Sequence, residues 1–219
     1  MTTATERSSL ADIHYRDTSC VLLYDPKDLA EVDLNLLRRD TPFEEIQYSK
    51  SEVPGIAMQS EERFIRAVIQ YTRLEFVQML DSPFAERSMD VLGQIMRALP
   101  ELSVKSFGLN YTVAWTTADS EPAGQYVCGQ FLSPQARLEE QLGNRVFAGS
   151  VRMFFGEPGQ YRDLRLTPET LKSDNVVLQY HYHNEESVRD RDRLIRLLAE
   201  QYASELPRLT RALETIRRR

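Results

Sequence analysis

The order of apolar and polar residues predicts short strands grouped between single helices. An apolar run at 19–24 predicts a buried strand, and apolar residues at helical spacing over 26–39 predict a helix after it. Alternation at 45–48, together with the β-branched and aromatic residues of 63–70 and 74–79, predicts an antiparallel meander. The first part of the chain is therefore expected to be rich in strands.

The pattern then becomes helical before a second group of strands. Ser82-Pro83 supplies a cap and a proline start, and apolar residues recur on one helix face until Pro100. After an exposed loop at 119–124, a helix over 133–142 begins with another Ser-Pro pair and ends in a glycine. Further strands are predicted at 145–155, 161–166 and 175–183.

One long strand is predicted at 102–117, and its two faces differ. Bulky side chains alternate with small and short polar ones, so the bulky face has to meet the helices. The small face admits something close, which is another strand layer, a ligand or a second subunit. Ser106, Gly108 and Asn110 are accordingly candidate ligand-binding residues, although such an asparagine commonly pairs with a neighbouring strand or loop instead.

An apolar stripe runs through the C-terminal region, where an apolar residue recurs every seven positions from Val188 to Ile216. This spacing predicts either one long helix kinked at Pro207 or two consecutive helices. The stripe either packs onto the sheet of the same chain or forms a seam for a partner helix or a second subunit. For the seam, the candidate interface residues are Ile195, Leu198, Tyr202, Leu209, Leu213 and Ile216.

These elements predict an α+β fold with an antiparallel sheet of two similar strand-rich halves, helices packed on one face and a long C-terminal helix. Residues 1–17 are expected to form a flexible leader, and 18–219 a single domain. If the halves arose by duplication, they would span 44–117 and 133–219, although no residue identity between them is visible.

Composition places the chain among folded globular proteins. Of its 219 residues, 42% are hydrophobic and 27% charged, which excludes fibrous, low-complexity and wholly disordered classes. The net charge of −6 gives no general attraction to nucleic acid or to anionic lipid, so neither partner is expected. No window holds the ~20 apolar residues that a membrane span needs. Cys20 and Cys128 lie far apart, and the expected setting is a reduced cytoplasm with two free thiols.

One pattern suggests metal chemistry. His181 and His183 share a strand face, so both imidazoles can bind one divalent, zinc-like ion and support a metal-dependent hydrolase. The third ligand would come from Glu185, Glu186, Asp190 or His14. The alternative is that both histidines are simply solvated, on the strand face opposite the apolar residues of 176–182.

Two segments resemble a known group of sequences. The Leu99-Pro100 pair, followed by the Gly108-Leu109-Asn110-Tyr111 strand, and the strand at 175–184 are similar to segments of sporadically distributed bacterial proteins that have no characterised activity. The resemblance implies a bacterial α+β protein. It implies no activity and assigns no functional residue.

The sequence therefore leads to three functional hypotheses. The first is a non-enzymatic cytoplasmic protein, without a cofactor, that binds a protein partner or forms a homo-oligomer through its sheet face and C-terminal helix. The second is a metal-dependent hydrolase centred on His181 and His183. The third is a small-ligand-binding protein that uses the small-residue face around Gly108.

Overall fold

A computed structural model describes most of the chain. The described residues are 13–49, 54–79, 86–117, 121–131, 135–144 and 146–217. Three sequence predictions lie outside them: the first twelve residues of the leader, the Ser82-Pro83 cap and the Ser133-Pro134 helix start. No helix in the described part is both long and apolar enough to cross a membrane.

Nine strands form one sheet in the order β2-β3-β4-β5-β1-β6-β9-β8-β7, and every neighbouring pair is antiparallel. The strands are β1 (His14–Tyr24), β2 (Glu45–Ser49), β3 (Gly55–Ser60), β4 (Ile65–Gln70), β5 (Arg73–Gln78), β6 (Val104–Thr116), β7 (Val151–Glu157), β8 (Gln160–Pro168) and β9 (Asn175–Asn184). The helices are η1 (Leu29–Glu31), α1 (Leu34–Asp40), α2 (Glu86–Ala98), α3 (Ala123–Phe131), α4 (Gln135–Leu142) and α5 (Arg191–Arg217). The predicted α+β class is confirmed.

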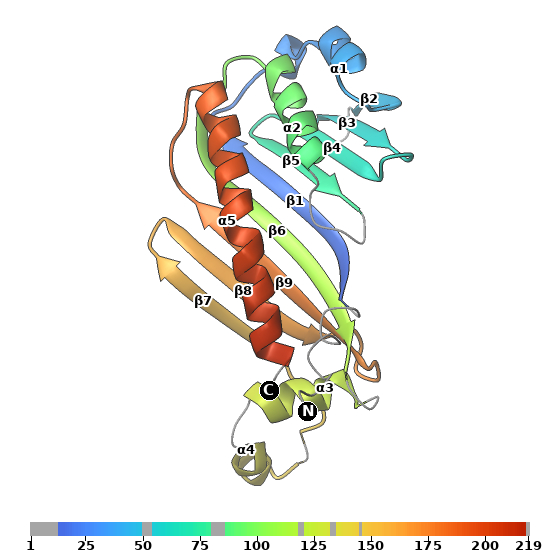
Figure 1. The fold of residues 1–219 in the computed structure, drawn as a ribbon, viewed down its shortest axis with the longest axis vertical. Coiled ribbons are helices and arrows are strands. Elements are labelled where there is room, and N and C mark those ends of the chain that lie inside the picture. The colour runs from blue at the N-terminus through green and yellow to red at the C-terminus, as the bar shows by residue number, and fades with distance from the viewer. Residues whose placement is uncertain are drawn as a thin grey trace, which may run out of the picture.

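The β1–β6 pair lies at the centre of the sheet and joins two halves of similar topology (Figure 1). In the first half β5 pairs with β1 and leads into α2, and in the second β9 pairs with β6 and leads into α5. The division suggested by the sequence, 44–117 and 133–219, groups β6 with the first half. In the sheet, β6 is instead the first strand of the second half, the one that pairs with β1.

The strand predicted at 19–24 is present but begins earlier, at His14. The expected leader is therefore wrong for its last residues, which pair with β6 from His14 opposite Ala114 onward. A register shift between Tyr15 and Asp17 marks an irregularity in this polar part. Long-range pairing with β6 holds a segment that carries no local apolar pattern.

The helix predicted over 26–39 is broken into η1 and α1. The Asp28 carboxylate accepts a hydrogen bond from the Ala30 N–H at 2.9 Å, and the Asp33 carboxylate accepts one from the Leu36 N–H, also at 2.9 Å. Val32 between them is extended. Each aspartate side chain accepts a hydrogen bond from a backbone N–H in the first turn of a short helix. These two caps favour two separate helices over one continuous helix.

Two elements were not predicted. The first is β3, since the sequence indicated only the turn that precedes it. In this strand the buried Ile56 and Met58 alternate with exposed residues. The loop expected at 119–124 ends in the first residues of α3. There Gly124 lies so close to Ala148 that a Cβ on the glycine would be 2.6 Å from the alanine Cβ. The glycine thus lets the start of α3 lie directly against the backbone at 147–148.

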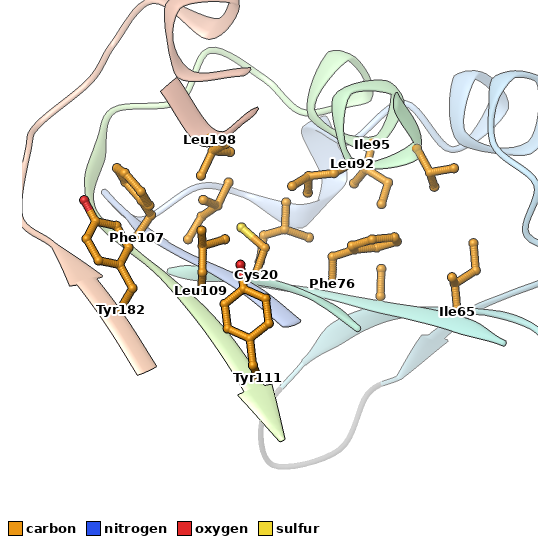
Figure 2. Close-up of a cluster of buried hydrophobic side chains, with 14 of the residues drawn as sticks. Cys20, Ile65, Phe76, Leu92, Ile95, Phe107, Leu109, Tyr111, Tyr182 and Leu198 are labelled. Atoms are coloured by element: carbon orange, nitrogen blue, oxygen red, sulfur yellow. The ribbon is translucent and has the colours of Figure 1, made fainter. Parts of the chain in front are cut away.

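The core lies between the sheet and one layer of helices. Helices α2 and α5 cover the same face, and side chains such as Phe76, Leu92 and Leu198 fill the space between the layers (Figures 1 and 2). The predicted two-faced character of β6 is confirmed, because Phe107 and Leu109 point into this core and are 0–1% exposed. Within the described residues, no helix covers the opposite face of the sheet.

The C-terminal stripe forms one uninterrupted helix, α5, with Pro207 inside it. Four of the six candidate interface residues are buried in the chain's own core: Leu198, Leu209, Leu213 and Ile216. Ile195 and Tyr202 are half-buried and pack against the same core. Of the two interpretations of the stripe, the structure places it on the sheet of the same chain, where it is not accessible to a partner helix.

A buried ion pair attaches α5 to the second half of the sheet. Glu205 is fully buried, and its carboxylate accepts two hydrogen bonds from the Arg162 guanidinium, at 2.6 and 3.1 Å. The Tyr180 hydroxyl donates to the same carboxylate at 2.6 Å, and Arg208 donates at 2.9 Å. These donors satisfy a charge that would otherwise be costly to bury.

We expect Tyr180→Phe to lower the free energy of unfolding by about 2 kcal/mol, because it removes a hydrogen bond to a buried charged group. The matched control is Tyr111→Phe. Tyr111 is equally buried, but its hydroxyl has no hydrogen-bond partner among the described residues, so its removal should be neutral or stabilising. Urea unfolding of the three proteins measures both effects, and equal losses in the two variants would contradict the assignment.

Candidate functional site

The face of the sheet opposite α2 and α5 holds a polar hollow of about 410 Å³ over the middle strands. Side chains alternate along each strand, so the side chains that face the hollow lie between core residues in sequence, and two of those core residues, Tyr111 and Tyr180, also border it. The lining residues are Ser19, Glu75, Asn110, Tyr111, Thr112, Arg152, Asp163, Arg165, Gln179, Tyr180 and His181. They come from six strands, β5, β1, β6, β9, β8 and β7, so the hollow exists only in the assembled sheet.

A hydrogen-bonded row crosses the hollow from β1 to β9. Ser19 is opposite Asn110, and Asn110 is opposite His181 in the strand register. The Asn110 side-chain amide donates to the Ser19 hydroxyl at 2.9 Å, and the Asn110 side-chain carbonyl lies 2.5 Å from Nδ1 of His181. Asn110 thus pairs with neighbouring strands, which was the second interpretation of this residue.

This row defines the state of the His181 ring. Because the Asn110 amide nitrogen donates to Ser19, its oxygen is the acceptor that faces His181, and Nδ1 of the ring must carry the proton. Burial lowers the pKa of His181 from its ordinary value, and the neighbouring His183 adds to the effect while Asp163 opposes it. The neutral ring therefore leaves Nε2 without a proton, as a hydrogen-bond acceptor, on a residue that lines the hollow.

The other two candidate ligand-binding residues lie beside this row. A Cβ on Gly108 would be 2.7 Å from Cε1 of His181, so the small face of β6 is partly occupied by the histidine ring. Ser106 is 8% exposed. Ser106, Gly108 and Asn110 thus lie on one face of β6, but only Asn110 lines the hollow.

Two arginines that the sequence analysis did not identify stand opposite each other at one end of the hollow. Arg152 on β7 is the register partner of Arg165 on β8. Arg152 makes a bidentate pair with Asp163, with its shortest contact at 2.7 Å. Arg165 is exposed and makes no hydrogen bond or ion pair with the described residues, and Gln179 next to it in the register is also exposed. Like charges directly opposite in an antiparallel pair are destabilising. Here Asp163 offsets the charge of Arg152, while the charge of Arg165 has no partner among the described residues.

The metal hypothesis depends on a third ligand. The rings of His181 and His183 are neighbours, with centroids 5.8 Å apart, and Nε2 of His183 lies 3.4 Å from Glu185. His183 also packs on Tyr161, at a centroid distance of 4.8 Å. Within the described ranges, no group of three or more His, Cys, Asp or Glu side chains is placed to hold a metal ion.

The hollow also has no activated nucleophile. Asn110 separates Ser19 from His181, so the serine hydroxyl does not contact the imidazole that would act as its base. Both cysteines are buried, and burial raises the pKa of Cys20 to about 12 and also raises the pKa of Cys128. The arrangement is suited to binding polar groups, because it combines fixed donors with fixed acceptors.

Comparisons with known proteins give little further information. No family model matches the chain, and no curated protein matches it. Among solved structures, Methanococcus jannaschii TBP is similar over 95% of this chain and 99% of its own, with 13% sequence identity and a TM-score of 0.39. A likeness at this level does not bear on function.

We expect Gly108→Ala to displace the His181 ring, because the new methyl group would overlap Cε1. The hydrogen bond between His181 and Asn110 should be lost, with a new chemical shift for the His181 ring in two-dimensional NMR. Gly129→Ala in α3 is the control, since its methyl group meets no atom within 4 Å. Unchanged His181 resonances in the Gly108 variant would contradict this packing.

We expect His181 to titrate below its ordinary pKa of 6.5. The unfolded chain then binds a proton at this histidine at a higher pH than the folded chain does. The contribution of His181 to the free energy of unfolding is therefore complete above about pH 6.5 and falls as the pH drops. NMR titration of the ring and unfolding at several pH values measure the effect. His181→Gln should flatten the stability profile below pH 6.5, and a titration at or above 6.5 would contradict the prediction.

Proposed function

We propose that this protein is a non-enzymatic binding protein that takes a small polar ligand with an anionic group on the helix-free face of its sheet. The observation that carries the proposal is the polar hollow of about 410 Å³, which falls in the size range typical of small-molecule sites. It lies on the sheet face that none of the described helices covers. The other surface considered from the sequence, the apolar stripe of α5, is used in the chain's own core.

The anionic group is inferred from the arginine end of the hollow. Arg152 and Arg165 are register partners, and Arg165 and the neighbouring Gln179 have no partner among the described residues. An oxyanion there would accept hydrogen bonds from Arg165 and Gln179, and it would offset the charge of Arg165, since Arg152 is already paired with Asp163.

The other end of the hollow supplies acceptors. Nε2 of His181 is held toward the ligand by the hydrogen bond on Nδ1 of the same ring, and Glu75 lines the opposite side. A hydroxyl or amine on the ligand would donate to these groups. The lining contains two arginines and two carboxylates, Glu75 and Asp163, so its charge is balanced. This favours a compact polar molecule over a polyanion such as nucleic acid.

Titration with succinate and with inorganic phosphate, followed by NMR, tests the proposal. We expect shifts at the side chains of Arg165, Gln179 and His181. Arg165→Gln should weaken binding by about 10-fold or more, because it removes a charge-assisted hydrogen bond.

Arg196→Gln is the matched control for charge. Arg196 is exposed on α5, which covers the other face of the sheet, so its loss changes the net charge equally without touching the hollow. Equal weakening in both variants, or shifts away from the hollow, would overturn the proposal.

A further inference from the structure

Strand β7 is an edge of the sheet whose outer side is open. It pairs only with β8, and its outer backbone groups make no hydrogen bond with another strand in the described chain (Figure 1). Open edges are normally shortened, charged or covered, because they otherwise pair with other chains. The strand at the opposite edge, β2, is shortened in this way, since it has five residues whereas β7 has seven.

The centre of β7 is apolar on both faces and exposed. Phe154 is 61% exposed and points to the helix-free face, while Phe155 is 46% and Met153 37% exposed on the helix side. On the helix side an apolar hollow of about 370 Å³ adjoins the strand. It is lined by Phe131, Met153, Phe155, Leu164, Arg211, Ala212, Thr215 and Ile216.

We propose that β7 pairs antiparallel with β7 of a second copy, which joins the two nine-stranded sheets into one. The pattern of β7 is self-complementary around Phe154. In the register centred there, Phe154 meets its own copy, and Met153 on each chain meets Phe155 of the other on the helix side. The apolar hollow of each copy then lies beside the new strand pair, next to Met153 and Phe155 of the other copy.

Charge also selects this register. Arg152 lies opposite the partner's Gly156, and Glu157 lies opposite the partner's Val151, so no like charges face each other. A register centred on Arg152 would place the two arginines opposite each other. The interface lies next to the polar hollow and includes Arg152 of its lining, but not Arg165, Gln179 or His181, on which the proposed ligand depends.

A cysteine at the symmetry position tests the pairing and its register together. Directly opposite residues in an antiparallel pair have Cα atoms about 4.5–5.5 Å apart, which suits a disulfide. Phe154→Cys should therefore form a covalent dimer on mild oxidation. Glu157→Cys is the control, because its two copies would be six residues out of register and about 20 Å apart. The native cysteines are buried and do not compete.

Light scattering gives the second measurement. We expect the native chain to have twice its 25.4 kDa mass and Phe154→Asp to be monomeric, since two carboxylates would face each other. Circular dichroism should show Phe154→Asp folded, because the side chain is mostly exposed in the single chain. Tyr48→Asp on β2, where Tyr48 is 50% exposed, should remain dimeric.

A native monomer, a dimer that survives Phe154→Asp, or cross-linking through Glu157→Cys in preference to Phe154→Cys would each overturn the proposal.

Discussion

The antiparallel pairing of β1 with β6 is the interaction on which the rest of this structure depends. Each strand has a buried side under the helices, where Cys20 and Leu22 of β1 lie with Phe107 and Leu109 of β6, all 0–1% exposed. Strand β5 adds to the outer side of β1 and β9 to the outer side of β6, so each half extends outward from this pair. The helices that follow β5 and β9 then cover the same face. Without the central pair, the two halves would not share one sheet or one core.

One face of the sheet forms the core, and the other face carries the polar hollow. On the core side, the buried Glu205 and the partly buried Arg162 hold α5 against the sheet. In the described part of the chain no helix covers the other face, which holds hydrogen-bonded polar residues, including the row from Ser19 through Asn110 to His181. Side chains on that face do not fill the space between the sheet and the helices, so substitutions there disturb the packing of the core less than substitutions at core positions do.

Several features were readable from the chain because they depend on local pattern. The alternation in β6 and β9 correctly assigned which side chains face the core, and His181 and His183 lie on the face opposite the buried Tyr180, as expected. Helix α5 was expected from its apolar spacing. The errors fall where non-local forces decide. The polar start of β1 at His14 is held by pairing, and the helix expected over 26–39 is divided by local caps that compete with its apolar spacing.

The sequence by itself determined the class of the fold, the approximate positions of most elements and the two-faced character of the central strands, because side-chain periodicity is a property of neighbouring residues. Only the tertiary structure decided which strands are adjacent. Ser19 and Asn110 are 91 positions apart in sequence, yet they share a hydrogen bond, because β1 and β6 pair at one register. The meeting of Arg152 with Arg165 is different, because the turn between β7 and β8 sets the register of that hairpin. Strand order, and the register of strands far apart in sequence, arise from packing over long separations, and no local pattern encodes them.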